Sequence, residues 1–389
     1  MYLRKMLRVE PGPRPIEPFA VVHRTRALMR VRDPAAAPFG AVRLSDIFPL
    51  PKRLFNPDTG ALEFPEFGTN EFVNAVTVLG IAFSLVLVAV DLALRRFAPD
   101  GLFSSDGARA RKRAVKRAPK TLRGASERVD LRLARREQIS PDTVRLTFAL
   151  PSPEHVLGLP TGQHVGISYV DAEGVRQERP YTPTSSDYDF GVAAFVIKVY
   201  KPNEKFPLGG KVSQFLGAMK VGDVASFVGP KGMKTYEGKG VFSVKRLASQ
   251  GGGFERRRCA DVGMIAGGSG ITPMLQISRA MLDDGDKVKI SLLFANQTEA
   301  DILCREEIES DAAKFGPSKF RAAYTLDKPP ANGWSHYSGF ITKEMIQKTM
   351  PPPGKNTQIL ICGPPPMLKF AVLPALEELG YTKDMFLTW

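Results

Sequence analysis

The hydrophobic period of the chain changes once, near Val262, and this change constrains the fold more than any other feature. Before it, apolar and polar residues alternate in short runs bounded by Gly and Pro, as at Val144 to Phe148 and Phe195 to Val199. A period of two predicts strands, and several such runs without helical segments predict a small antiparallel β-barrel over residues 128–240. After it, strand-length and helix-length segments alternate, which predicts a doubly wound parallel α/β sheet over residues 261–389.

The second half is expected to begin with a strand at Val262 to Ala266, followed by a Gly-rich turn at residues 267–270. Thr272 is expected to cap the next helix, with Pro273 at the first helical position. Further strands are expected at 287–295, 320–324 and 358–362, and further helices at 305–315 and 366–379. A glycine turn at a helix N-terminus suits dinucleotide phosphates, because free amides and the helix dipole both point at the anion. The spacing is not Gly-x-Gly-x-x-Gly, so this turn alone is a weak signal.

Four short motifs follow one another along the chain. Arg179-Pro180-Tyr181-Thr182 ends an expected strand, and Gly209-Gly210-Lys211-Val212-Ser213 comes about thirty residues later. Gly267-Gly268-Ser269-Gly270-Ile271-Thr272-Pro273 and Cys362-Gly363-Pro364-Pro365-Pro366-Met367 each follow an expected parallel strand. Arg-Pro-Tyr-Thr alone is more often an ordinary strand end with a turn. Its spacing from the glycine motif that follows favours a functional site.

In this order the four motifs resemble those of the ferredoxin–NADP reductase superfamily, and their finer wording resembles its NADH–cytochrome b5 reductase branch. The resemblance covers residues 130–389. It implies that FAD binds to the first half and NADH to the second, and that FAD passes electrons to a haem protein such as cytochrome b5. It differs at two single positions, since Lys201 stands where an aromatic residue is usual and Ser269 replaces a more usual threonine. Residues 239–258 also differ from the family pattern, so no residue role is carried over there.

The resemblance implies a cofactor role for two sets of residues. The FAD set is Arg179, Pro180, Tyr181, Thr182, Val196, Lys198, Tyr200, Gly210, Lys211, Val212 and Ser213. The NADH set is Gly267, Gly268, Gly270, Thr272, Asp327, Cys362, Gly363, Pro364 and Met367. Thr182 is implied to lie beside the reactive nitrogen of FAD, and Cys362 near the nicotinamide carbon that gives up hydride, so these two are the candidate catalytic residues. No metal site is expected, and Trp389 is left without a role.

The residue types in these sets fit the chemistry. Arg179 supplies a fixed charge with fork geometry, Tyr181 a flat apolar face with a polar tip, and Thr182 a hydroxyl. Two residues keep a second interpretation. Cys362 is otherwise a buried strand cysteine, the commoner fate of this residue type. Asp327 follows an expected strand and is implied to select NADH through the ribose hydroxyls, but a turn or helix-cap aspartate is an equal alternative from the residues alone.

A basic run that lies mostly before the resemblance indicates a membrane. The chain carries a net charge of +14, and fourteen Lys/Arg against four Asp/Glu lie between Arg95 and Arg136. Nucleic acid is the usual partner of such a run, but this one directly follows the apolar stretch 72–94, which is long enough to approach a span of the bilayer. We therefore expect a transmembrane helix and no nucleic-acid partner; the alternative is a buried helix. Because Lys and Arg crowd its C-terminal flank, the reductase should face the cytosol, on the endoplasmic reticulum or the mitochondrial outer membrane.

The expected organisation has six parts. An N-terminal extension, 1–71, precedes the membrane segment 72–94, a basic linker 95–127, the FAD-binding barrel 128–240, an interdomain linker 241–260 and the NAD-binding domain 261–389. Within the interdomain linker, Gly251-Gly252-Gly253 followed by Arg256-Arg257-Arg258 predicts a flexible loop. Residues 1–70 are rich in Pro and Arg, which suits a disordered segment, a targeting extension or an overlong start equally well. The three cysteines show no disulfide or metal spacing, which favours a reducing compartment.

The sequence thus predicts a membrane-anchored NADH-dependent flavoprotein reductase with cytochrome b5 as acceptor. Two alternatives stay open. A related flavoreductase would deliver electrons to a quinone or another haem protein. A membrane-tethered scaffold would keep the fold without the chemistry, although the intact Arg179, Tyr181, Thr182, Ser213 and Cys362 argue against it.

Overall fold

The structure is a computed structural model and describes residues 105–204 and 206–389. The predicted membrane segment and N-terminal extension lie outside the described residues, as does Lys205. Within the described ranges, no helix is both long enough and apolar enough to span a bilayer.

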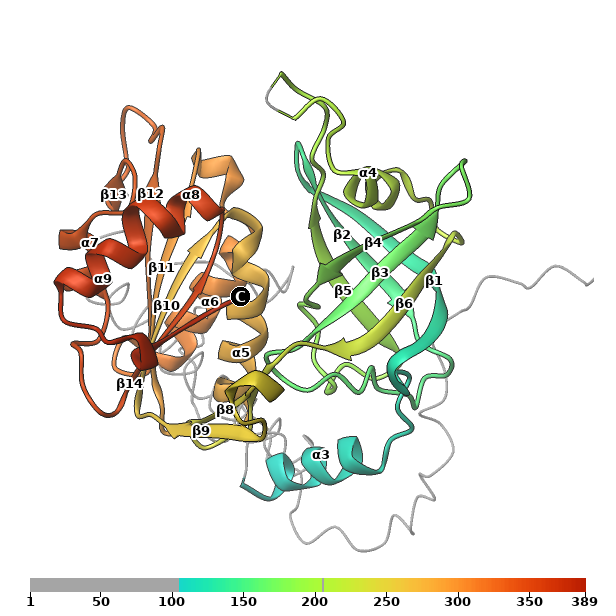
Figure 1. The fold of residues 1–389 in the computed structure, drawn as a ribbon, viewed down its shortest axis with the longest axis horizontal. Coiled ribbons are helices and arrows are strands. Elements are labelled where there is room, and N and C mark those ends of the chain that lie inside the picture. Colours follow the sequence, from blue (N-terminus) through green and yellow to red (C-terminus); the bar gives the residue numbers. More distant parts are fainter. Residues whose placement is uncertain (1–104, 205) are drawn as a thin grey trace, which may run out of the picture. The chain divides into compact units, whose positions relative to one another are not determined.

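The first half is a six-stranded antiparallel sheet with the strand order β4-β3-β6-β1-β2-β5 (Figure 1). Its strands are β1 (Gly124–Ser140), β2 (Thr143–Ala149), β3 (His164–Val170), β4 (Arg176–Tyr181), β5 (Val192–Lys198) and β6 (Val224–Lys231), and helix α4 (Lys211–Ala218) joins β5 to β6. The edge segments meet where Thr184, just after β4, donates its amide to the Ala194 carbonyl of β5 at 2.8 Å. The sheet therefore curls towards closure, as expected of a barrel.

The core of this half confirms the predicted alternation. Phe148, Phe195 and Phe227 are fully buried, and the rings of Phe148 and Phe227 meet edge to face with centroids 4.9 Å apart. Phe195 and Ile197 face this core, whereas Val196, between them on β5, packs with the core of the second half. Strand β5 is thus covered on both faces, and its Val196 side chain points towards the second half.

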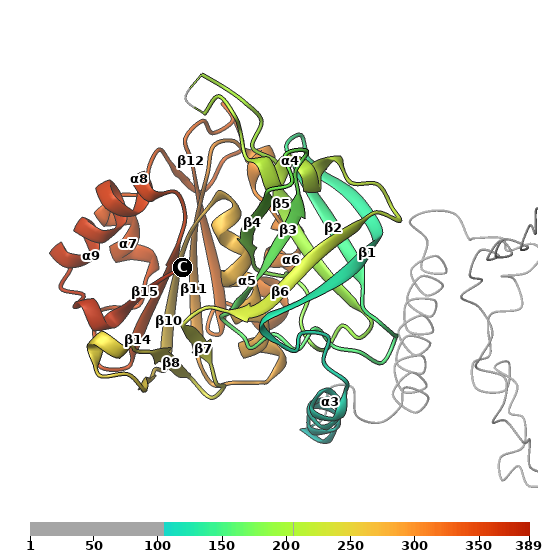
Figure 2. The ribbon, with the colours of Figure 1, turned by 45° about the vertical axis from the view of Figure 1, so that its right-hand side comes forward.

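The second half is a six-stranded parallel sheet with the strand order β13-β12-β11-β10-β14-β15. Its strands are β10 (Asp261–Gly267), β11 (Lys289–Asn296), β12 (Phe320–Leu326), β13 (Tyr337–Ser338), β14 (Thr357–Cys362) and β15 (Phe386–Thr388). Helices α5 (Ile271–Asp283) and α6 (Arg305–Phe315) cover one face, and α7 (Lys343–Thr349), α8 (Pro365–Met367) and α9 (Leu373–Glu378) cover the other (Figure 2). The strand order reverses between β10 and β14, which is where such sheets bind ligands.

Two expectations about the second half were wrong in detail. Thr272 does not cap α5: the helix begins at Ile271 after Gly270, and the Thr272 hydroxyl donates back to the Ser269 carbonyl at 3.2 Å. The short 3₁₀ turn Gly268–Gly270 already bends the chain into the helix, so no side-chain cap is needed. The expected helix at 366–379 contains a π-helical stretch at Leu368–Val372. Pro374 follows it, and a proline removes one helical hydrogen bond and crowds the carbonyl four residues earlier.

The segment predicted as a flexible loop forms part of a three-stranded antiparallel sheet instead. Its strands are β7 (Lys234–Tyr236), β8 (Val241–Lys245) and β9 (Phe254–Arg258), in the order β7-β8-β9. The three glycines lie in the β8–β9 connection with φ between +64° and +87°, a conformation that favours glycine. The glycines therefore indicate a hairpin turn, and the arginines that follow lie on β9.

Helix α3 (Ser105–Arg117) forms within the segment expected as a basic linker. It touches both halves: the Arg111 guanidinium lies 4.6 Å from the centroid of the Tyr188 ring in the first half, and Lys112 pairs with Asp284 of the second half at 3.0 Å. Tyr188 also donates its hydroxyl to Asp284 at 2.9 Å. The basic residues of this segment thus partly serve to join α3 to the folded unit.

Candidate active site

A cavity of about 1430 Å³ lies between the two halves, bounded by β4, β5 and α4 on one side and by the ends of β10 and β14 on the other. All twenty residues that the sequence assigned to FAD and NADH line it. The four motifs, which span about 190 residues of sequence, therefore form one site.

The flavin side of the cavity carries an unengaged positive charge. Arg179, near the end of β4, is exposed, and its guanidinium donates to the neighbouring Glu178 carbonyl at 2.7 Å. The Glu178 carboxylate pairs instead with Arg128, at 2.7 Å, and with Lys231. Within the described chain Arg179 has no carboxylate partner, so its guanidinium can bind an anion such as a phosphate.

Tyr181 and Thr182 follow Arg179 on the cavity wall. Tyr181 is half-buried, and this burial, together with the nearby Tyr200 hydroxyl, raises the pKa of its phenol above the usual range. The phenol is therefore neutral, with an aromatic face and a hydroxyl that can serve a ligand. Thr182 also lines the cavity and adds a second hydroxyl.

The glycine motif ahead of α4 forms the next part of the flavin side. Gly209 has φ +58°, and a Cβ there would lie 2.5 Å from the Tyr200 carbonyl oxygen. Gly210 is the residue before the helix, and Gln214 donates the first helical amide bond, to the Gly210 carbonyl at 2.8 Å. The amides of residues 211–213 precede that bond and are oriented for an anion.

Ser213 also lines the cavity and contacts the glycine turn directly. Its hydroxyl donates to the Gly210 carbonyl at 2.9 Å and accepts the Tyr200 amide at 3.1 Å. The hydroxyl therefore fixes the glycine turn against the segment that follows β5, which shapes the cradle for a ligand.

The nucleotide side is built from two backbone turns that lie against each other. A Cβ at Gly270 would lie 2.2 Å from the Cys362 carbonyl oxygen, and one at Gly267 would lie 2.7 Å from Met367 Sδ. Only glycine allows the turn after β10 to approach the turn after β14 this closely. Backbone amides and the N-terminus of α5 thereby reach the cavity at the switch point of the sheet.

Cys362 ends β14 and lines the cavity as a half-buried thiol. Burial raises the pKa of this thiol to about 11, although the nearby Lys234 acts in the opposite direction. Cys362 is therefore a neutral thiol at physiological pH, suited to packing beside a ring rather than to nucleophilic attack.

Asp327 follows β12 and is exposed on the cavity rim. Its amide donates to the Asn296 carbonyl at 3.0 Å, which holds the backbone of this turn against the end of β11. The carboxylate has no hydrogen bond or ion pair with the described residues. Partial burial raises its pKa, as expected for a carboxylate that lacks a donor in the free protein.

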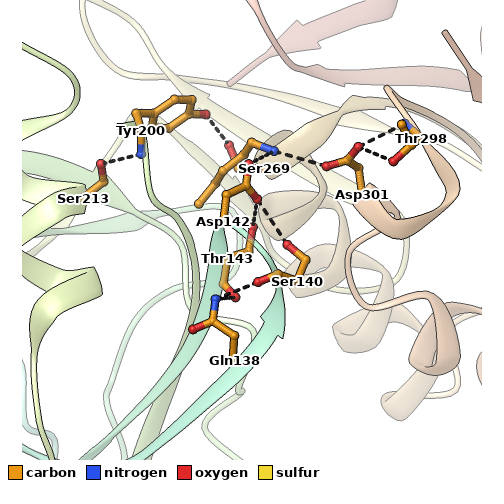
Figure 3. A network of polar contacts seen from close by, with 10 residues as sticks. Gln138, Ser140, Asp142, Thr143, Tyr200, Ser213, Ser269, Thr298 and Asp301 are labelled. Carbon is orange, nitrogen blue, oxygen red and sulfur yellow. Dashed lines mark hydrogen bonds and ion pairs between the residues drawn. The ribbon is translucent and has the colours of Figure 1, made fainter. Parts of the chain in front are cut away.

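Two side chains join the halves across the cavity wall, one at the end of β5 and one just after that strand (Figure 3). The Lys198 ammonium pairs with Asp142 at 2.8 Å in the first half and with Asp301 at 3.6 Å in the second. The hydroxyls of Tyr200 and Ser269 lie 3.2 Å apart. Lys198, assigned to the flavin side, is thus engaged by carboxylates from both halves.

Family models match each half. The model described as the oxidoreductase FAD-binding domain matches residues 130–236, and that described as the oxidoreductase NAD-binding domain matches residues 264–372. The chain is 50% identical to NADH-cytochrome b5 reductase 2 of Gallus gallus over 269 residues, which are 68% of this chain and 87% of the relative. It is 46% identical to the Homo sapiens reductase 2 over 279 residues, which are 70% of this chain and 99% of the relative.

The chain belongs to the NADH–cytochrome b5 reductase family. A solved structure agrees: the cytochrome b5 reductase domain of Ulva prolifera nitrate reductase aligns with a TM-score of 0.64 and 37% identity, covering 70% of this chain and all of that one. The two-domain FAD- and NAD-binding reductase fold is therefore established for residues 130–372.

The cavity of this reductase fits the two cofactors. Arg179 offers charge for a phosphate. The turns at Gly210 and Gly270 are so close-packed that a Cβ at either glycine would clash with a neighbouring atom. At the end of β11, Asn296 is buried and lines the cavity, yet neither its side-chain oxygen nor its nitrogen has a partner in the described structure. A buried amide without partners is costly, so this position suits a polar ligand.

Several lining residues of the reductase were missed by the sequence reasoning. They include His164, Phe206, Asn296, Gln297, Phe340, Phe370 and Trp389. Phe340 and Phe370 are 77% and 73% exposed, and large exposed aromatic side chains at a cavity rim are a binding signal that only the structure reveals. For Asn296 and Gln297 a signal existed, since Asn296 ends a parallel strand beside the predicted switch point and Gln297 follows it.

Proposed function

We propose that this chain is an NADH-dependent, FAD-containing reductase that delivers electrons to cytochrome b5 from a membrane anchor. The observation that carries the proposal is the meeting of the Arg179-to-Thr182 segment and the Cys362 turn on one cavity. When bound, FAD accepts hydride from NADH and passes electrons singly to a haem acceptor. The residues described above prepare the site for that chemistry.

Each wall has its own task. Arg179 and the amides before Gln214 bind the FAD phosphates, while Tyr181 and Thr182 orient its ring. On the other side, the Gly267-to-Gly270 turn and the start of α5 bind the NADH phosphates, and the neutral Cys362 thiol packs beside the nicotinamide. The apolar walls exclude water, and holding two rings in one orientation is itself a large part of the rate enhancement.

A spectroscopic and kinetic experiment tests this function. The purified chain should show a flavin spectrum that NADH bleaches under anaerobic conditions, and it should then reduce purified cytochrome b5. A flavin spectrum bleached by NADH together with failure to reduce cytochrome b5 would point to a quinone or another haem protein. A chain that binds no flavin would support the scaffold alternative.

The membrane anchor is a proposal from sequence. Its support is the uncharged stretch within residues 72–94 and the fourteen Lys/Arg between Arg95 and Arg136. By the positive-inside rule the reductase faces the cytosol, on the endoplasmic reticulum or the mitochondrial outer membrane. Protease added to sealed organelles should digest the reductase, and complete protection of it would overturn this topology.

A further inference from the structure

Lys234 is a half-buried cation beside the cavity that the proposed function does not use. It begins β7, just after the flavin half. Its ammonium donates to the carbonyl oxygen of Thr388 and lies 5.3 Å from the centroid of the Trp389 ring. A cation over a tryptophan face is attracted by the ring, more strongly where water is excluded.

Trp389, the residue that Lys234 contacts, ties both halves of the cavity together. Its amide donates to the Ile361 carbonyl at 2.8 Å, next to Cys362 on β14. Its indole Nε1 donates to the Gly162 carbonyl of the flavin half, also at 2.8 Å. The indole itself lines the cavity.

The surroundings of Lys234 are electrostatically coupled to the cavity wall. Burial lowers the pKa of Lys234, while Cys362 acts in the opposite direction. Burial also lowers the pKa of His164, a cavity-lining residue, and Lys231 and Lys234 add to this effect. Three cavity-lining side chains, Trp389, Cys362 and His164, are therefore within the influence of one ammonium group.

We propose that Lys234 is a positioning residue that holds Trp389, and through it the Cys362 end of the cavity, in the geometry required for transfer between the two rings. The contact with the Thr388 carbonyl fixes the backbone, and the contact with the ring fixes the indole. Phosphates and ribose are held elsewhere, by the Gly267-to-Gly270 turn and Asp327. Loss of Lys234 therefore disturbs ring alignment and leaves most of the NADH binding energy intact.

The first test measures Trp389 directly and does not depend on activity. The chain has two tryptophans, so Trp334→Phe leaves Trp389 as the sole indole reporter in the full chain. Lys234→Met in this background should raise acrylamide quenching of Trp389 by about twofold, because the ring loses its cation contact. Lys234→Arg, which keeps charge and donors, should restore low quenching. Lys245→Met removes an exposed lysine from the same small sheet and is the matched control.

The second test rests on the proposed function and separates binding from transfer. Lys234→Met should lower kcat per bound flavin about tenfold while KM for NADH stays within about twofold, since small misplacements of reacting groups are costly. In a double-mutant cycle, adding Trp389→Leu to Lys234→Met should cost little more than Trp389→Leu alone. Quenching and kcat equal to those of Lys245→Met, or fully additive effects in the cycle, would overturn the proposal. If the parent chain does not oxidise NADH, the proposed function fails, and the quenching test still decides whether Lys234 holds Trp389.

Discussion

The two halves of the cavity prepare for their ligands by different physical means. The flavin half adds side-chain charge to its glycine turn: Arg179 is exposed without a carboxylate partner in the described chain, and Lys211 begins α4 on the cavity wall. The nucleotide half presents backbone: its two turns approach so closely that a Cβ at Gly270 would meet the Cys362 carbonyl oxygen at 2.2 Å. Asp327 is one of the acidic residues that line the cavity on this side, together with Asp301 and Glu378.

This difference implies different tolerance to substitution. A charge on an exposed side chain can be replaced by another residue with a graded loss of affinity. A backbone turn that only glycine permits fails over a single added methyl group, because the atoms that would have to move belong to the main chain. The flavin half should therefore respond to charge and salt, and the nucleotide half to shape.

The largest effect is expected for Gly270→Ala. The added Cβ would displace the Cys362 turn. A misplacement of reacting groups by about 1 Å can cost about 100-fold in rate, so kcat/KM for NADH should fall roughly 100-fold. Flavin content should stay normal, because the FAD residues lie on the other half. Gly354→Ala, where the nearest atom to a Cβ is 3.9 Å away, is the control in the same half. Normal NADH kinetics in Gly270→Ala would remove the distinction between the halves.

Arg179→Ala should give the next largest effect, on flavin affinity. Removing a charge-assisted hydrogen bond to phosphate costs about 1.5–3 kcal/mol, which corresponds to roughly a 10- to 150-fold loss of FAD affinity. Titration of flavin-free protein with FAD measures this directly. Arg179→Lys keeps the charge without the fork geometry, so its FAD affinity should lie between that of the parent chain and that of Arg179→Ala. A variant Arg179→Ala that purifies with a full complement of FAD would place the phosphates elsewhere.

Asp327→Thr tests the acidic side chain at the nucleotide rim. Removing a negative charge beside the ribose should relieve repulsion of a 2′-phosphate, so the ratio of kcat/KM for NADPH to that for NADH should rise about tenfold, equivalent to roughly 1.4 kcal/mol. Steady-state kinetics with both nucleotides measure the ratio. An unchanged ratio would make Asp327 a turn residue, held only by its amide bond to Asn296.

Lys211→Glu should have the smallest effect when the protein is saturated with FAD, and under that condition we expect it mainly on the acceptor. Lys211 is exposed beside the flavin wall, and cytochrome b5 is expected to be an acidic partner. The KM for cytochrome b5 should rise several-fold and KM for NADH should change little. Raising the salt concentration should slow cytochrome b5 reduction more than ferricyanide reduction, since salt screens exposed charges. Lys245→Glu is the control, and an equal effect from it would indicate general charge rather than a docking site.

Much of this arrangement could be predicted from the sequence because periodicity reports burial. Val144, Leu146 and Phe148 alternate because one face of β2 lies in a core, and all three are buried. The strands β10, β11, β12 and β14 were placed within a few residues for the same reason. The four motifs were informative because glycine and proline turns at strand ends report backbone conformations that other residues avoid.

The remaining features depend on contacts between distant segments, which periodicity does not encode. Nothing near Lys198 in sequence indicates that its ammonium reaches Asp301 of the other half. The same holds for Trp389, whose partners Gly162 and Lys234 lie in other segments. The prediction of a flexible loop at glycines 251–253 was wrong because a hairpin turn and a flexible loop have the same composition. The prediction that Thr272 caps helix α5 was wrong because the 3₁₀ turn before it already starts the helix.

Helix α5 connects the cavity with a contact between the two halves that lies at its other end. Its first turn lines the cavity, and the residue that follows its last turn, Asp284, accepts the Tyr188 hydroxyl and pairs with Lys112 of α3. Thirteen residues at 1.5 Å each separate the two ends by about 20 Å. A rotation of 10° about the Tyr188–Asp284 joint would therefore move the cavity end of α5 by about 3.5 Å on this helix geometry. Helix α3 contacts both residues of that joint, through Arg111 to Tyr188 and through Lys112 to Asp284. The segment that leads into the flavin half therefore lies at the pivot of any such motion that widens the cavity.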